Sequence, residues 1–148
     1  MKVLLLNGSP HEHGCTDTAL QEVASALREE GIDAEIFWIR NEPVGGCIGC
    51  GGCAKAGKCV FGGTVNEFAE KAMAADGFVF GTPVHYAAAS GNVTAFLDRL
   101  FYSAPKAAFC RKPAAVVTSA RRAGTTAAYE QLLKYPGMSE MPIVSSCY

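Results

Sequence analysis

Short apolar runs alternate along this chain with stretches in which apolar residues recur every three or four positions. The apolar runs predict β-strands over residues 3–6, 34–39, 77–81, 114–118 and 142–146. The stretches of helical period predict α-helices that begin near Thr16, Thr64, Asn92 and Thr125. Because parallel strands need crossover connections, this strict alternation predicts an α/β fold with a doubly wound, parallel, five-stranded sheet.

The length of 148 residues suits one domain, so we expect a single domain over residues 1–148. The chain ends at Tyr148, directly after the last predicted strand, where a further helix would ordinarily cover the sheet. We therefore expect the terminal helix of this fold to be missing from this chain. In a doubly wound sheet, ligands bind beyond the carboxyl ends of the strands, where the strand order reverses.

Composition and charge narrow the classes of partner. Thirteen Lys and Arg residues balance fourteen Asp and Glu residues, and no basic run is longer than Arg121–Arg122, so we expect no nucleic acid partner. No apolar run approaches the roughly 20 residues of a membrane span. The run at residues 3–6 is also too short for the core of a signal peptide. We expect a cytoplasmic protein without a membrane partner.

Residues 40–63 form a connection rich in glycine and cysteine that is longer than ordinary loops. It contains four of the seven cysteines, at Cys47, Cys50, Cys53 and Cys59. Thiolates spaced by two residues can converge on one centre, so this loop predicts an iron–sulfur cluster in a reducing compartment. Zinc is the first alternative, although structural zinc sites usually pair two well-separated cysteine knuckles. Free thiols in an empty loop are the second alternative.

The loop after the first predicted strand, residues 7–16, has the composition of a phosphate-binding loop. Its glycines let backbone N–H groups turn inward, Ser9 and Thr16 offer hydroxyls, and the helix that follows favours an anion at its start. No Walker lysine follows the last glycine, and the spacing is not the dinucleotide fingerprint. A phosphate monoester therefore fits better than a triphosphate or a pyrophosphate. A plain turn with Thr16 as helix cap is the alternative.

Two further loops follow strands at the predicted carboxyl edge of the sheet, and both contain residues suited to binding a ligand. Residues 81–86, Gly-Thr-Pro-Val-His-Tyr, can cradle the edge of a flat heterocycle, although His85 and Tyr86 also suit ordinary loop packing. The loop that starts at Ser119 contains Arg121 and Arg122, of which one can face a ligand while the other faces solvent. No arrangement of a Ser, His and Asp nucleophile is evident, so the sequence does not support hydrolysis.

Three segments in this order and spacing resemble the flavodoxin-like NADPH-dependent FMN reductase family: Asn7-Gly8-Ser9-Pro10, Gly81 to Tyr86, and Leu97-Asp98-Arg99. The resemblance covers nearly the whole chain. It is closest to the iron–sulfur flavoprotein branch, whose compact cysteine motif resembles Cys47-x2-Cys50-x2-Cys53-x5-Cys59. The chain departs from the family pattern at Cys15, where relatives usually carry a small polar residue, and at Gly62-Gly63, where relatives often carry acidic residues.

The resemblance implies a flavodoxin-like FMN-binding domain with strand order 2-1-3-4-5 and FMN at the switch point. It implies that the first loop surrounds the FMN phosphate, that the second lines the isoalloxazine, and that the third closes the other side. The residues implied are, in that order, Ser9, His11, Gly14, Cys15 and Thr16; Pro83, Val84, His85 and Tyr86; and Ser119, Arg121, Arg122 and Gly124.

The expected function is that of an FMN-dependent oxidoreductase or electron-transfer flavoprotein in which a [4Fe-4S] cluster is coupled to FMN. The flavin carries the chemistry, so no catalytic side chain is expected. Because the cysteine loop follows the second strand, we expect the cluster beside the flavin loops. The partners implied are a ferredoxin-type donor or NAD(P)H, and further copies of the chain in a dimer or tetramer.

Two other functions remain open from the sequence. One is an NAD(P)H-dependent FMN, quinone or azo reductase without a cluster. The other is a non-enzymatic carrier of the flavodoxin type. The net charge of −1 disfavours the carrier, because such proteins steer toward their partners with a strongly acidic face.

Overall fold

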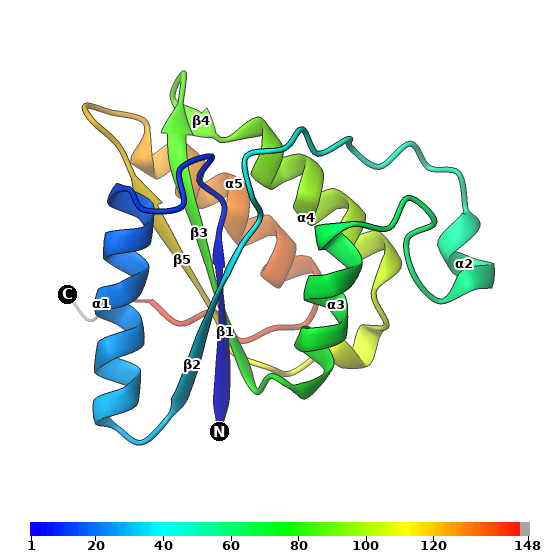
Figure 1. Ribbon diagram of the computed structural model, residues 1–148, viewed down its shortest axis with the longest axis horizontal. Helices are drawn as coiled ribbons and strands as arrows, with labels where there is room; N and C mark the ends of the chain where they lie inside the picture. The colour runs from blue at the N-terminus through cyan, green and yellow to red at the C-terminus, as the bar shows by residue number, and fades with distance from the viewer. Residues whose placement is uncertain (146–148) are drawn as a thin grey trace.

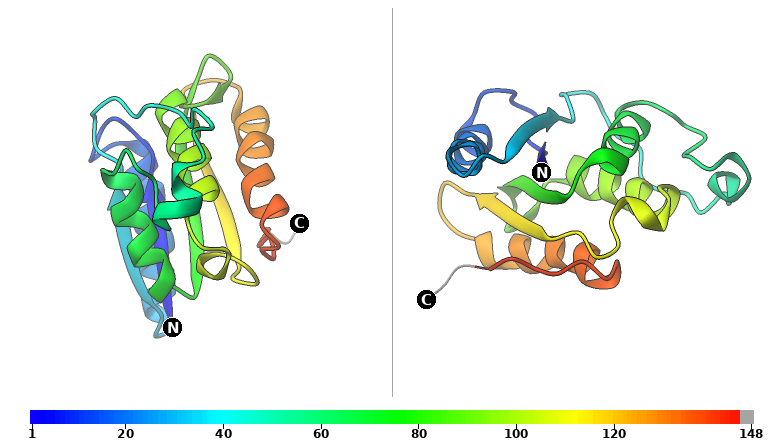
Figure 2. Two further views of the ribbon diagram at one scale, coloured as in Figure 1. Left: turned by 90° about the vertical axis from the view of Figure 1, so that its right-hand side faces the viewer. Right: turned by 90° about the horizontal axis from the view of Figure 1, so that it is seen from below.

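The computed structural model describes residues 1–145 and shows a twisted sheet between helices (Figure 1, Figure 2). The parallel strands are β1 (Lys2–Asn7), β2 (Asp33–Trp38), β3 (Gly77–His85) and β5 (Ala114–Ser119). They lie in the order β2-β1-β3-β5, and the two-residue strand β4 (Ala88–Ala89) turns back antiparallel onto the end of β3. The predicted α/β fold and its parallel order are confirmed, and the switch point lies between β1 and β3.

The last predicted strand, residues 142–146, is present only in part. Ile143 pairs with Ala114 through an isolated parallel bridge, and Val144 N donates to the same residue's carbonyl oxygen at 2.8 Å. The segment therefore lies beside β5, at the place expected for a fifth parallel strand, without becoming a full strand within the described residues. Ser146, the predicted end of this strand, lies outside the described residues.

The helices are α1 (Cys15–Glu29), α2 (Gly52–Ala56), α3 (Thr64–Ala74), α4 (Gly91–Ser103), a 3₁₀ turn η1 (Lys106–Ala108) and α5 (Thr125–Met138). The four long helices begin within one residue of their predicted starts. The short α2 and η1 were not predicted, because neither segment is long enough to show a helical period. Within residues 1–145, no helix is long and apolar enough to cross a membrane.

The two faces of the sheet bury different clusters of side chains. On one face, α3, α4 and α5 cover a large cluster with four phenylalanines at 2% exposure or less, namely Phe68, Phe78, Phe80 and Phe96. Two of these rings, Phe68 and Phe96, pack edge to face with centroids 5.7 Å apart and so join α3 to α4. The opposite face packs a smaller cluster, including Leu5 and Val79 from the sheet, against Leu20 of α1. The central strands β1 and β3 are thus buried by helices on both sides, which places ligand sites at the edges of the sheet.

Candidate functional site

The loops that follow β1, β3 and β5 meet at the carboxyl edge of the sheet. The backbone N–H of Gly8 donates to the carbonyl oxygen of Gly81 at 2.9 Å. Pro83 pairs with Ser119 in the register of β3 and β5. The hydroxyls of Thr16 and Ser119 are hydrogen-bonded at 2.7 Å. The structure therefore brings together the predicted phosphate loop, the predicted ring-edge loop and the predicted arginine loop.

Two glycines allow these loops to approach one another closely. A Cβ on Gly8 would lie 1.7 Å from Cγ2 of Val93 and 2.7 Å from the carbonyl oxygen of Gly81. A Cβ on Gly124, whose φ is +95°, would lie 2.5 Å from the Cα of Ala87. Only glycine fits at such positions, because any side chain would push the loops apart.

The first turn of α1 opens among these loops. The helix follows Gly14, whose backbone is extended and which makes no side-chain cap, so the interpretation of Thr16 as helix cap is wrong. Thr16 is instead the second helical residue, 2% exposed and bonded to Ser119. The first N–H groups of a helix have no partner within the helix, and they favour an anion. This end of α1 is therefore a suitable place for a phosphate group.

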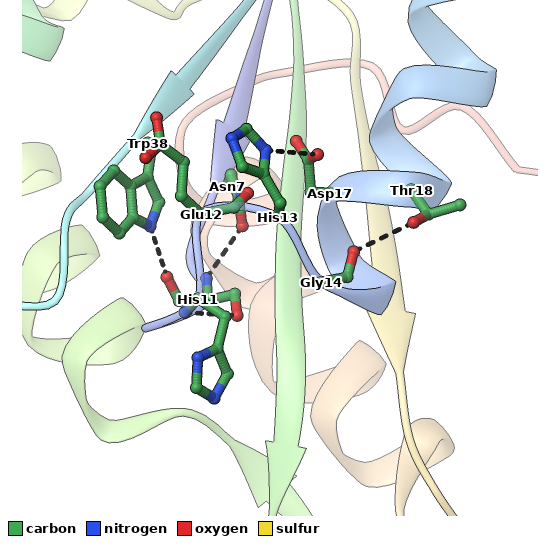
Figure 3. A network of polar contacts seen from close by, with 9 residues as sticks. Asn7, His11, Glu12, His13, Gly14, Asp17, Thr18 and Trp38 are labelled. Atoms are coloured by element: carbon green, nitrogen blue, oxygen red, sulfur yellow. Dashed lines mark hydrogen bonds and ion pairs between the residues drawn. The ribbon is translucent and has the colours of Figure 1, made fainter.

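Hydrogen bonds stabilise the conformation of the predicted phosphate loop (Figure 3). Asn7 Oδ1 accepts from the N–H of Ser9 at 3.1 Å, and Asn7 Nδ2 donates to the carbonyl oxygen of Glu12 at 3.0 Å. Trp38 Nε1 donates to the carbonyl oxygen of Ser9 at 2.8 Å. The Ser9 Oγ accepts from the N–H of His11 at 3.1 Å, which leaves its own O–H for a further acceptor.

The sequence placed Asn7 in this loop without assigning it a role, and it did not assign Trp38 to this site. Asn7 is completely buried and bridges two turns of the loop with its side chain. Trp38 ends β2 and is the single tryptophan of the chain, a signal that could have indicated it. Both residues shape the loop through its backbone.

The predicted flavin residues divide into buried and exposed groups. Ser9 and Thr16 are buried, and five others are partly buried, namely Gly14, Pro83, Val84, Ser119 and Gly124. The exposed ones are His11, Cys15, His85, Tyr86, Arg121 and Arg122. Tyr86 occupies the tip of the hairpin between β3 and β4 with a φ of +48°, and its side chain is fully exposed. The predicted phosphate end of the site is thus largely buried, whereas the predicted ring end is open to solvent.

The four cysteines of the long loop line one cavity of about 130 Å³ against α4. Cys47 and Cys50 are exposed, Cys53 is half-buried, and Cys59 is buried. The Cys53 thiol donates to the carbonyl oxygen of Tyr102 at 3.6 Å. No three His, Cys, Asp or Glu side chains of the described residues are grouped so as to hold a metal ion. The predicted ligands therefore share a cavity but are not assembled around one point.

Hydrogen bonds from side-chain amides anchor the long loop of residues 40–63 near both of its ends. The Asn92 side chain accepts from the N–H of Val44 at 3.4 Å and donates to the carbonyl oxygen of Glu42 at 3.1 Å. Near the other end, Asn66 Nδ2 donates to the carbonyl oxygen of Cys59 at 2.9 Å. These contacts direct the loop along α4.

The cysteine cavity lies apart from the flavin loops within one chain. The loop leaves β2 and runs along the molecule to α2, at the end opposite α1, in both views that show the long axis (Figure 1, Figure 2). The cavity contacts Tyr102 and Ser103 in the last turn of α4, whereas Gly91 begins this helix beside the hairpin. At 1.5 Å per residue the two ends of α4, Gly91 and Ser103, are separated by about 18 Å along the helix. The predicted cysteine ligands therefore lie farther from the flavin loops of the same chain than their position after the second strand indicated.

The family model for NADPH-dependent FMN reductases matches residues 1–148. An iron-sulfur flavoprotein of Methanocaldococcus jannaschii is 35% identical over 99 residues, which are 67% of this chain and 51% of that relative. The chain spans about half the length of the curated relatives it matches.

Solved structures share the fold. RosB with bound 8-demethyl-8-formylriboflavin-5'-phosphate superposes with a TM-score of 0.75 at 17% identity, covering 97% of this chain and 61% of RosB. A flavodoxin from the domain Archaea gives a TM-score of 0.63 at 15% identity, covering 99% of this chain and 80% of the flavodoxin. At these identities the likeness shows a flavodoxin-like fold.

Proposed function

The chain belongs to the NADPH-dependent FMN reductase family, and from this premise we propose that it is an FMN-dependent oxidoreductase. The loops after β1, β3 and β5 hold the flavin. The observation that carries this proposal is the uncapped first turn of α1, which opens where Thr16 and Ser119 join two of these loops. Bound FMN supplies hydride and single-electron chemistry, and the chain's own residues bind and orient it.

Each loop has its own part in holding FMN. The first N–H groups of α1 and the hydroxyls of Ser9 and Thr16 bind the phosphate, whose charge the helix end stabilises. The isoalloxazine lies along the loop of Pro83, Val84, His85 and Tyr86. The other side is closed by Ser119, Arg121, Arg122 and Gly124. The fixed phosphate end and the open ring end suit a flavin whose ring exchanges electrons with a second molecule.

Replacing Thr16 by valine is expected to weaken FMN binding by about tenfold, because a hydrogen bond to a charged group contributes about 1.5 kcal/mol or more. Binding of riboflavin, which lacks the phosphate, is expected to change much less. Titration of flavin fluorescence measures both affinities.

The matched control is Thr18→Val. The Thr18 hydroxyl donates to the carbonyl oxygen of Gly14 at 3.2 Å and is exposed on the same turn of α1. This variant is expected to bind FMN as the unaltered protein does. Failure of the unaltered protein to bind FMN at saturation would defeat the proposal, and an equal loss for FMN and riboflavin would contradict the role of Thr16.

We further propose that Cys47, Cys50, Cys53 and Cys59 hold a [4Fe-4S] cluster. Their number suits such a cluster, and all four line the same cavity. The exposed Cys47 and Cys50 lie on a glycine-rich segment that can adjust when iron binds. A cluster passes one electron at a time, so the donor is a ferredoxin-type protein, with NAD(P)H as the other candidate.

A second candidate function is an NAD(P)H-dependent FMN, quinone or azo reductase without a cluster. It is favoured by the observation that the described cysteines are not grouped around a metal position. Anaerobic purification, with quantification of flavin, iron, acid-labile sulfide and zinc, distinguishes the candidates. Iron and sulfide support the cluster, stoichiometric zinc supports a structural metal, and FMN with neither supports the simple reductase.

We propose that the chain forms a homo-oligomer, a dimer or a tetramer. Four exposed apolar side chains surround the cysteine cavity, namely Ile48 at 71%, Val60 at 54%, Phe61 at 58% and Tyr102 at 74% exposure. Exposed apolar patches of this kind favour association. Because the cavity and the flavin loops of one chain lie at opposite ends of α4, about 18 Å apart along the helix, contact between copies would offer a shorter path for electrons.

Replacing Phe61 by lysine is expected to shift the protein from oligomer to monomer at micromolar concentration, because a charge in an apolar contact opposes association. Analytical ultracentrifugation measures the change. Met138→Lys is the control, since Met138 is 87% exposed at the end of α5, away from the cavity. A monomeric unaltered protein would contradict the proposed oligomer.

A further inference from the structure

Two hydrogen-bond donors from α4, Arg99 and Ser103, line the cysteine cavity beside Tyr102. We propose that these two side chains are positioning residues that stabilise the negative charge of the group held by the cysteines. This inference rests on the proposed cluster, and it adds residues that do not themselves ligate iron.

Arg99 is a buried cation with an unusual set of partners. Arg99 is 9% exposed, and its Nε donates to the Cys59 Sγ at 3.3 Å. Its Nη2 donates to the carbonyl oxygen of Gly62 at 2.8 Å. None of the ion pairs among the described residues includes Arg99. A buried charge is costly without a counter-charge, so the site favours an anion at the cysteine sulfurs.

Ser103 offers the second donor one helical turn further on. Its Oγ is buried and has no hydrogen-bond partner within the part of the chain that the structure describes. Residues four apart lie on the same face of a helix, and both Ser103 and Arg99 line the cavity. An unpartnered hydroxyl in a protein interior is unfavourable, and a sulfur acceptor in the cavity would satisfy it.

The chemistry of the proposed cluster fits these two donors. Four thiolates and an iron–sulfur core together carry negative charge, which increases when the cluster accepts an electron. Hydrogen bonds to the sulfurs and a nearby positive charge stabilise the reduced form more than the oxidised form, which raises the reduction potential. Residues that form hydrogen bonds with the metal ligands also hold these ligands in position and slow the loss of metal. Arg99 acts through Cys59, and Ser103 acts on a sulfur of the cavity.

The test compares Arg99→Gln, Arg99→Lys and Ser103→Ala with the unaltered protein, all purified anaerobically with iron and FMN bound. The readouts are the midpoint potential of the cluster, followed by electron paramagnetic resonance, and the rate of iron transfer to a chelator. The midpoint potential of FMN serves as an internal control, because the flavin loops lie at the other end of α4.

Arg99→Gln is expected to make the cluster potential more negative and to release iron about tenfold faster. Arg99→Lys is expected to recover part of the potential, because it keeps the charge but lacks the planar fork of donors. Ser103→Ala is expected to shift the potential in the same direction by less, with the fold intact. The FMN potential is expected to stay unchanged in all three variants.

Two results would overturn the inference in distinguishable ways. If Arg99→Gln and Ser103→Ala lower thermal stability while the cluster potential and iron release stay unchanged, the two residues only stabilise the fold of the cysteine loop. If Arg99→Gln does not fold, an unchanged potential in Ser103→Ala and Arg99→Lys overturns the inference in the same way. If the unaltered protein binds neither iron nor sulfide, the proposed cluster fails and this role of Arg99 and Ser103 fails with it.

Discussion

Serine in place of Cys53 is expected to abolish the iron–sulfur absorbance of the anaerobic protein and to leave FMN bound. Cys53 lies on α2 and lines the cavity with the other three cysteines, so its loss leaves an incomplete set of ligands. The flavin loops lie at the other end of α4, about 18 Å away along the helix, and do not include this residue. Absorbance spectra, with iron and flavin quantified, measure both effects. Reduction of FMN by a one-electron donor should fall steeply, while direct chemical reduction of FMN should not.

Cys110→Ser is the matched control for this substitution. Cys110 lies outside the cysteine loop, and its thiol donates to Glu140 Oε2 at 3.3 Å. Cys110→Ser should retain both the iron–sulfur absorbance and the bound FMN. Retention of iron and sulfide in Cys53→Ser would contradict the proposed ligand set. Loss of a colourless, stoichiometric metal would identify zinc instead, and identical spectra without iron in both proteins would identify a reductase without a cluster.

Replacing Gly8 by alanine is expected to lower the free energy of unfolding by about 3 kcal/mol and to weaken FMN binding. The added Cβ would overlap Val93 of α4 and would lie 2.7 Å from the carbonyl oxygen of Gly81. The side chain of Val93 can rotate, but the carbonyl belongs to the centre of the sheet and cannot move freely. The loop must therefore shift, and Ser9 shifts with it. Urea unfolding and flavin titration measure the two effects.

Gly45→Ala is the control, because nothing lies within 4 Å of a Cβ at that position. Its free energy of unfolding is expected to change by less than about 0.5 kcal/mol. If Gly8→Ala is as stable as Gly45→Ala, the close approach of β1 and β3 loops does not constrain the site. If Gly8→Ala loses stability but binds FMN with unchanged affinity, the loop after β1 does not hold the phosphate.

Much of the fold could be predicted from local patterns. The runs of apolar residues identified β1, β2, β3 and β5. The signal is strongest for β1 and β3, because a strand buried on both faces requires a continuous apolar sequence. The start of α4 was predicted at Asn92 and lies at Gly91. The errors fall where a local pattern is weak. Thr16 was one possible helix cap in the sequence, yet Gly14 precedes α1 and no side chain caps this helix.

The candidate flavin site could be predicted as three loops but not as contacts. Thr16 and Ser119 lie 103 residues apart, and their hydrogen bond depends on the pairing of β5 with β3. Arg99 was part of a recognised sequence segment without an assigned role, and its contact with Cys59 spans 40 residues. Contacts over such separations depend on packing, which a local pattern does not contain.

The sequence by itself determined the alternation of strands and helices, the loops that carry functional residues, and the number of candidate iron ligands, because these depend on residue type and short-range spacing. The tertiary structure alone decided which loops touch and how far the cysteines lie from the flavin loops. A loop as long as residues 40–63 can follow many paths from the same strand. The contacts of Asn92 and Asn66 direct this loop along α4. The cysteines are therefore separated from the flavin loops, although both follow strands at the same edge of the sheet.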